Sequence, residues 1–260
     1  MTEILSALEL RKLIRSNKWT KPTSGTAPGY VQANLVMIPK EAAFHFLLFC
    51  TRNPKPCPIL DVLEPGCVEP AIARGADLRK DLPKYRIYRN GVLDVEVPDV
   101  TGVFSEEMVS FLLGCSFSFE TAMMANGLPI RNIEENKNVS MYITNRTCRE
   151  AGPFSAPLVV SMRPLEPLQA IRAVQITTRF HLTHGAPVYL GDHRAIGIKE
   201  LAKPDFGDAV TIRPGEVPVF WACGVTSIMA AISAKLPMVI THSPGHMFVS
   251  DLKDEDLTVL

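Results

Sequence analysis

Two short stretches of the sequence combine residue types that could do chemistry. The first is FLLGCSFS at 111–118 and the second is VFWACGVT at 219–226. In each, an apolar run ends on a cysteine, Cys115 or Cys223, and a turn rich in Gly, Ser and Thr follows. Such turns let backbone approach a ligand closely, and the free N–H groups at a helix start attract anions. We therefore expect two anion-binding turns, suited to a substrate with two carboxylates or to one acidic substrate held between two related halves.

The two stretches also begin similar segments. Each leads into a helical pattern that ends in Leu-Pro fourteen residues after the cysteine, at Pro129 and Pro237. Ser118 and Thr226 hold equivalent places and could cap the two helices. These similarities suggest an internal repeat. The alternative is that both are ordinary strand-to-helix turns of an α/β core.

The two thiols raise a sharper hypothesis. A cysteine at a helix N-terminus has a lowered pKa, so Cys115 and Cys223 could carry thiolates. Two thiolates on opposite faces of a carbon acid could exchange its proton, as in a cofactor-independent racemase or epimerase of an acidic amino acid. The alternative is that both cysteines are small residues tolerated at a tight turn.

The remaining candidates follow predicted strand ends, because ligands bind outside the carboxyl ends of strands in α/β sheets. Arg163 ends the apolar strand at 158–162, and its planar fork suits a carboxylate, although a buried ion pair is the alternative. Histidine titrates near neutrality and suits acid–base work. The candidates for catalysis are Glu120, His242, His246, Cys115 and Cys223, and those for substrate binding are Arg163, Ser116, Ser118, Gly224, Thr226, His184 and Asp192.

The same histidines could in principle bind a metal together with Asp192. Their spacing matches no established metal-binding pattern, and the sequence has no GxxxxGK[ST] motif for a nucleotide. We therefore predict neither a metal nor a cofactor.

The elements that must position these residues suggest an α/β protein. From residue 158 onward the order is strand, helix, strand, strand, helix, strand, which favours an α/β sheet. We predict a mixed, partly parallel sheet with flanking helices and a second, smaller α+β subdomain. The expected segments are 1–138 with the first cysteine turn, 139–210 as the mid-chain subdomain, and 211–260 returning to the main sheet.

Composition excludes several classes of protein. The 260 residues can form one large or two medium domains, and 47% apolar with 21% charged residues is typical of a soluble globular chain. The net charge is zero and no Lys/Arg block forms a stripe for nucleic acid. No apolar run is long enough for a membrane span, and the start lacks a signal-peptide pattern. We expect a cytoplasmic protein with reduced cysteines, a small acidic substrate and no membrane partner, and a homo-oligomer stays open.

The chain also resembles a known family. The motifs GYVQANLVMIP, FCTRNPKPCP, ADLRKDLPKYRIYR, GCSFSFE, VVSMRP, HGAPVYLGD, PVFWACGVT and ITHSPGHMFVSD occur in this order between Gly29 and Asp251. In this arrangement they resemble the bacterial hydro-lyase family, which is similar to the catalytic region of mitochondrial D-glutamate cyclase. The resemblance implies an α/β protein of two closely packed subdomains. By analogy it implies removal of water from D-glutamate to give 5-oxo-D-proline, but it assigns no catalytic residues.

The implied reaction sets requirements that these residues could meet. A base must deprotonate the amine, and His242, His246 or Glu120 could do so. Arg163 would hold the α-carboxylate, and backbone N–H groups at 116–118 or 224–226 would stabilise the oxyanion. A thioester on Cys115 or Cys223 is an alternative route. A non-catalytic carboxylate-binding protein is the third hypothesis, after the hydro-lyase and the racemase.

Overall fold

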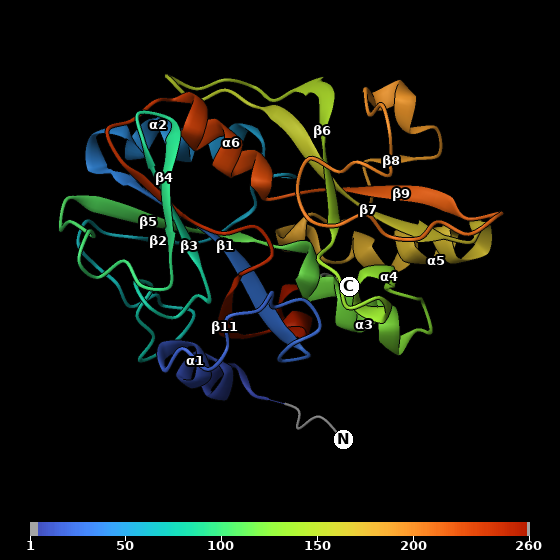
Figure 1. The fold of residues 1–260 in the computed structure, drawn as a ribbon, viewed down its shortest axis with the longest axis horizontal. Coiled ribbons are helices and arrows are strands. Elements are labelled where there is room, and N and C mark those ends of the chain that lie inside the picture. The colour runs from blue at the N-terminus through green and yellow to red at the C-terminus, as the bar shows by residue number, and fades with distance from the viewer. Residues whose placement is uncertain (1–4, 259–260) are drawn as a thin grey trace.

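The computed structural model describes residues 5–258, which form two β-sheets flanked by helices (Figure 1). The strands of the larger sheet are β1 (Tyr30–Pro39), β2 (Ile59–Leu63), β3 (Tyr85–Arg89), β4 (Val92–Val97), β5 (Met108–Gly114), β10 (Val239–His242) and β11 (Phe248–Lys253). Those of the smaller sheet are β6 (Ser140–Thr147), β7 (Pro157–Leu165), β8 (Tyr189–Leu190) and β9 (Val217–Ala222).

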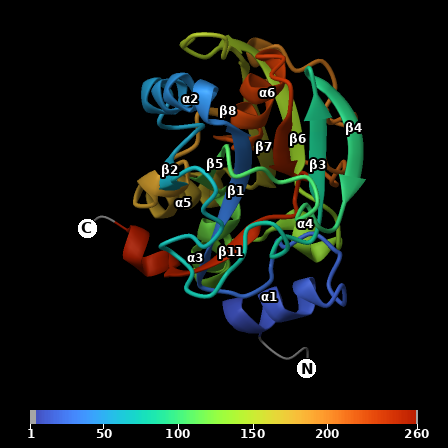
Figure 2. The same ribbon diagram turned by 90° about the vertical axis from the view of Figure 1, so that its left-hand side faces the viewer.

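Six α-helices are defined within these residues. They are α1 (Ala7–Arg15), α2 (Lys40–Arg52), α3 (Glu120–Ala125), α4 (Arg131–Glu134), α5 (Pro167–Thr178) and α6 (Val225–Ser233). Helix α1 lies at the opposite end of the molecule from α2 and α6 in both views (Figures 1 and 2). Short 3-10 turns cover Ser116–Phe119, His181–Thr183, His193–Ile196 and Asp254–Leu257. No helix in the described range is long and apolar enough to cross a membrane.

The α/β class is confirmed, but the expectation of a partly parallel sheet is wrong. The larger sheet has the order β2-β5-β1-β10-β3-β4, with β11 also paired to β1, and the smaller has the order β6-β7-β9-β8. All the pairings recorded between these strands are antiparallel. The units β1-α2-β2 and β7-α5-β8 do return the chain in the original direction. However, β5 and β9 insert between the two strands of each unit, so the strands that run parallel are not neighbours.

The structure supports the predicted internal repeat. Apart from the β3–β4 hairpin and α4, which occur only in the first half, that half runs β1, α2, β2, β5, cysteine turn, α3, β6. The second half runs β7, α5, β8, β9, cysteine turn, α6, β10. The central orders β2-β5-β1 and β8-β9-β7 are equivalent. The last strand of each half crosses over, because β6 pairs with β7 and β10 pairs with β1. The two halves therefore exchange one strand each.

Equivalent hydrogen bonds tie both cysteine turns to a neighbouring strand. The Ser118 hydroxyl accepts from the Gln32 N–H at 2.9 Å, and the Thr226 hydroxyl accepts from the Val159 N–H at 3.0 Å. Neither hydroxyl caps the following helix, in contrast to the sequence-based expectation. The N–H groups of Gln32 and Val159 are buried and need an acceptor, and the two hydroxyls provide it.

One apolar core contains side chains from both halves. Phe46 and Phe111 come from the first half, Val159 and Ile228 from the second, and Cys115 and Cys223 are part of the same cluster. The cysteine turns thus meet in an apolar environment. The larger sheet also includes β10 and β11 from the C-terminal segment, and the division at 138 and 210 stays a prediction.

Candidate active site

The centre of the candidate site is a buried ion pair between Arg163 on β7 and Glu120 at the start of α3. Each side chain is only 1% exposed, and Nη2 of Arg163 donates to Oε1 of Glu120. The guanidinium also donates to the hydroxyls of Ser116 at 3.2 Å and Ser161 at 3.3 Å. It lies 5.4 Å from the ring centroids of both Phe119 and Trp221. Arg163 therefore forms a buried ion pair, which was the alternative to binding a substrate carboxylate.

Glu120 connects this ion pair to the molecular surface. Its second oxygen, Oε2, accepts from the Ser24 hydroxyl at 2.8 Å. Ser24 lines a surface cavity of about 440 Å³, which we call the Ser24 cavity. Burial raises the pKa of the Glu120 carboxyl, while Arg163 and Ser24 favour its charged form. A carboxylate in this environment can both accept and return a proton.

The two cysteines lie close to this ion pair but are not thiolates. The backbone N–H groups of Phe117 and Val225, two residues after each cysteine, favour the thiolate form. Desolvation nevertheless raises the pKa of the Cys223 thiol to about 11 and that of Cys115 higher still. The expected lowering of both pKa values is wrong, because loss of hydration in the apolar core outweighs the effect of the helix start.

Two of the backbone donors expected to form an oxyanion site are occupied. The N–H groups of Ser118 and Thr226 donate to the carbonyls of Cys115 and Cys223. The turns position the neighbouring side chains, Glu120 and Ser116 among them.

Position 224 must be a glycine because it packs against Asn34, a residue that the sequence did not single out as a site residue. A Cβ added to Gly224 would lie 2.0 Å from Nδ2 of Asn34. That amide donates to the carbonyls of Leu113 at 3.3 Å and Gly114 at 2.8 Å. Asn34 thus holds the end of β5 next to the second cysteine turn by hydrogen bonds. The sequence alone could not place Asn34 beside the second cysteine turn. That position follows from the β1–β5 register, in which the neighbouring residue Ala33 pairs with Gly114.

His242 and His246 form a second polar group, separate from the ion pair. The Nδ1 atom of His242 accepts from the Leu35 N–H at 3.1 Å, and burial lowers its pKa to about 3. His246 lines another cavity, of about 510 Å³, together with Lys84, Arg86 and Glu96. Burial also lowers the pKa of His246, so the ring there is a neutral base.

The loop at residues 23–26 joins these two groups. Thr23 donates its N–H to the Gly245 carbonyl at 2.8 Å, and its hydroxyl accepts from the Met247 N–H at 3.0 Å. The next residue, Ser24, reaches Glu120. Asn138 lines both cavities and donates to the Pro244 carbonyl at 3.2 Å. The two cavities are therefore neighbours.

Of the other two predicted residues, His184 is buried and Asp192 is exposed. His184, at a φ of +83°, hydrogen-bonds the Lys55 carbonyl through Nδ1 at 2.8 Å. Burial lowers its pKa to about 4, and the charge of Arg163 adds to this effect. Asp192 has a side chain 63% exposed and caps the turn at His193–Ile196 through the Arg194 N–H. It is not part of the buried cluster.

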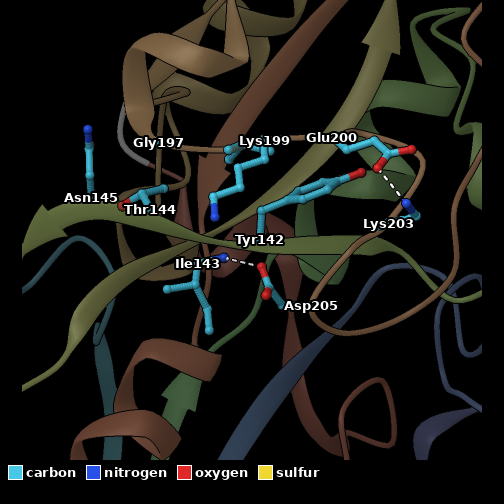
Figure 3. A pocket seen from close by; sticks show the side chains of 10 residues that line it. Tyr142, Ile143, Thr144, Asn145, Gly197, Lys199, Glu200, Lys203 and Asp205 are labelled. Atoms are coloured by element: carbon cyan, nitrogen blue, oxygen red, sulfur yellow. Dashed lines mark hydrogen bonds and ion pairs between the residues drawn. The ribbon is translucent and has the colours of Figure 1, made fainter.

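A third cavity, of about 560 Å³, lies over the smaller sheet and contains none of the predicted residues (Figure 3). Tyr142 donates to the Leu201 carbonyl, Asp205 accepts from the Ile143 N–H, and Glu200 pairs with Lys203. Its polar groups are thus largely satisfied by neighbours. Across residues 5–258, no group of three or more His, Cys, Asp or Glu residues is arranged to hold a metal ion.

Comparison with known proteins places the chain in a family. A protein of Geobacillus kaustophilus, named "Putative hydro-lyase GK2103", is 60% identical over 257 residues, covering 98% of each chain. A "Putative hydro-lyase" of Syntrophobacter fumaroxidans is 58% identical and covers 100% of each chain. A "Putative hydro-lyase YcsI" of Bacillus subtilis is 56% identical over 97% of this chain and 98% of its own.

Among solved structures, the crystal structure of a nitrogen repressor-like protein from Methanococcus jannaschii matches 94% of this chain and 98% of its own. The identity is 11% and the TM-score 0.38, too low to bear on fold or function. The profile described as D-glutamate cyclase matches residues 109–251, a range that contains both cysteine turns, Glu120 and Arg163. With this match and with relatives of 56–60% identity over nearly its whole length, the chain belongs to the D-glutamate cyclase family.

Proposed function

We propose that the protein is a hydro-lyase acting on a small acidic amino acid, and specifically that it cyclises D-glutamate to 5-oxo-D-proline with loss of water. The family and the names of the relatives support the reaction class. The observation that carries the proposal is the position of Glu120. This buried carboxyl is held by Arg163 on one oxygen and hydrogen-bonded to Ser24, beside a cavity, on the other.

Such a carboxyl can perform the proton transfers of the reaction. The substrate ammonium must lose two protons as its nitrogen bonds to the side-chain carboxyl carbon. One oxygen of that carboxyl must gain the same two protons to depart as water. A carboxylate with a raised pKa can take a proton through Ser24 and then return it to the leaving oxygen, so the relay needs no net proton donor.

In this proposal Arg163 positions Glu120 rather than binding the substrate carboxylate. Its Nη2 is committed to Glu120 and Ser116, and its Nη1 to Ser161. The ion pair favours the carboxylate form of Glu120 against the desolvation that opposes it. His246, neutral at the neighbouring cavity, is a candidate second base.

The alternatives that require a thiolate receive less support. A racemase with two thiols, or a thioester on Cys115 or Cys223, needs deprotonation of a cysteine in an apolar core. Burial raises both pKa values, that of Cys223 to about 11. The equivalent placement of the two turns keeps the racemase as the alternative that the experiment must distinguish.

The test is proton NMR of the protein with D-glutamate, and separately with L-glutamate, in D2O. Growth of 5-oxoproline signals from the D isomer supports the proposal. Loss of the α-proton signal without lactam indicates the racemase. If both spectra stay unchanged at high protein concentration, D-glutamate is the wrong substrate or the protein only binds carboxylates.

A matched pair of variants assigns the reaction to Glu120. Glu120→Gln keeps the shape but cannot take up a proton, and we expect turnover to fall at least about 100-fold. Glu134→Gln, a nearby carboxyl on α4 that is half exposed, should leave turnover unchanged. Equal activity in both variants would remove Glu120 from the mechanism.

A further inference from the structure

We propose that the Ser24 cavity is the substrate-binding site and that Asn132 accepts a hydrogen bond from the substrate amine there. This inference rests on the proposed function, because it places the amine beside the proton relay of Glu120. The cavity lies between the loop around Ser24 and the segment from Asn132 to Asn138. Neither Asn132 nor this cavity was among the residues that the sequence singled out.

The hydrogen bonds around Ser24 determine how the Asn132 amide is oriented. The single hydroxyl proton of Ser24 goes to Glu120, so its oxygen must accept from Asn132. The donor is Nδ2 of Asn132, at 3.2 Å. The amide oxygen, Oδ1, is therefore the atom of this side chain that Ser24 leaves without a partner.

That amide oxygen is buried and has no partner within the described residues. The Asn132 side chain is only 2% exposed, yet it lines the cavity. A buried acceptor without a donor costs free energy unless a ligand supplies one. An ammonium group, which has donors and no acceptor, is the chemistry that fits a free amide oxygen beside a carboxylate relay.

Within the described residues, the rim of the cavity offers one unpaired cation, Lys21. Lys21 and Lys137 line it with one carboxylate, Asp208. Lys137 is occupied by Glu135 and by the Ala209 carbonyl, whereas Lys21 has no recorded ion pair in the range 5–258. An amine recognised inside and a carboxylate at Lys21 together fit an amino acid such as the D-glutamate of the proposed function. They also place the amine next to Ser24, where its proton must leave.

The test compares two probes that differ only in the amine, D-glutamate and glutarate. In a thermal-shift titration the unaltered protein should bind D-glutamate about 10- to 100-fold more tightly than glutarate. Asn132→Ala should remove this difference. The control Asn136→Gly lines the same cavity at a φ of +53°, which glycine tolerates, and should keep the preference.

A second variant keeps the test valid if the Asn132 variant does not fold. Lys21→Glu changes an exposed side chain and should weaken binding of both probes about 5-fold. Lys18→Glu makes the same charge change at an exposed residue outside the cavity lining and should have little effect. Equal effects of the two charge reversals would overturn the assignment of this cavity.

The two proposals fail in different ways. Turnover of D-glutamate with an unchanged KM in Asn132→Ala would overturn the binding site and leave the cyclase intact. Binding with an amine preference that Asn132→Ala removes, but without turnover, would keep the site and reject the cyclase. If neither probe shifts the melting temperature and neither is turned over, both proposals are wrong.

Discussion

The backbone of the turn that follows each cysteine favours a thiolate at Cys115 and at Cys223. Desolvation acts in the opposite direction and is the larger effect at both residues. The same balance governs His184 and His242, which burial keeps neutral with pKa values of about 4 and about 3. At this scale the apolar surroundings determine which groups can work as bases. Glu120 differs from the cysteines because it forms a direct ion pair with Arg163.

Thiol reactivity tests this balance directly. At about pH 8, iodoacetamide should alkylate exposed Cys67 and leave Cys115 and Cys223 unmodified in the native protein. After denaturation all three should react, which is the internal control for labelling. Mass spectrometry of the peptides gives the result. Rapid native labelling of Cys223 would restore the two-thiol racemase as a serious candidate.

Asp254 should make stability depend on pH. Its carboxyl is 7% exposed, neither oxygen has a partner in the described residues, and burial raises its pKa to about 7. Since an unfolded aspartate titrates near about 3.9, the native state binds this proton more tightly. The resulting stability is present below the unfolded pKa and is lost as the pH rises through about 7.

The variant Asp254→Asn should therefore gain over the natural protein as the pH rises. We expect little difference at about pH 5 and a gain of roughly 2 kcal/mol at about pH 8, from urea unfolding. Comparing the two proteins at each pH cancels the histidines, whose lowered pKa values reduce stability as the pH falls below about 6.5. A constant difference for Asp254→Asn would contradict the raised pKa.

At the scale of elements, local signals in the sequence predicted much of the structure. The apolar run at 40–52 predicts a helix, and α2 has these bounds. The Asn90-Gly91 step predicts a hairpin, and it joins β3 and β4 with positive φ at both residues. The segment from Leu168 has helical spacing but many β-branched residues, so it allows helix or strand, and it is α5. Strand direction was not predictable in the same way. It depends on β5 and β9 entering between strands that a helix connects, which is a non-local event.

The two hydroxyl contacts at the cysteine turns should contribute equally to stability if the halves are equivalent. Thr226→Val leaves the buried Val159 N–H without its acceptor, and Ser118→Ala does the same to Gln32. We expect each to lower the free energy of unfolding by about 1–3 kcal/mol. Thr178→Val removes only a hydroxyl contact on the exposed side of α5 and should cost less than about 0.5 kcal/mol. Urea denaturation measures all three, and a neutral Thr226→Val would contradict the role given to this contact.

At the scale of the whole molecule, the sequence named several residues of the site but not their arrangement. It singled out Glu120 and Arg163 because each follows a predicted strand, and they do meet. It expected His242 and His246 at the same place, but β10 pairs with β1 rather than with the smaller sheet, which puts the histidines in a second group. The contribution of Ser24 depends on a loop joined to Gly245, over 200 residues away in the chain. No local sequence pattern can predict a contact between residues so far apart in the chain.

The exchange of β6 and β10 has a consequence for folding. Each sheet contains a strand from the other half, so neither sheet is complete without both halves. Tertiary structure in one half should therefore not persist when the other unfolds. We expect a single cooperative transition for the full chain.

Two variants with one tryptophan each can test this cooperativity. In Trp221→Phe the remaining Trp19 reports on the packing around α1 and β11, and in Trp19→Phe the remaining Trp221 reports on the smaller sheet. In each variant the urea midpoint from fluorescence should coincide with the midpoint from far-UV circular dichroism of the same protein. This comparison within one variant removes the stability change caused by the substitution, including loss of the Trp221 hydrogen bond to Thr177. A fluorescence transition that precedes the loss of secondary structure in either variant would show that one half unfolds alone, and the exchanged strands would then not couple the two halves.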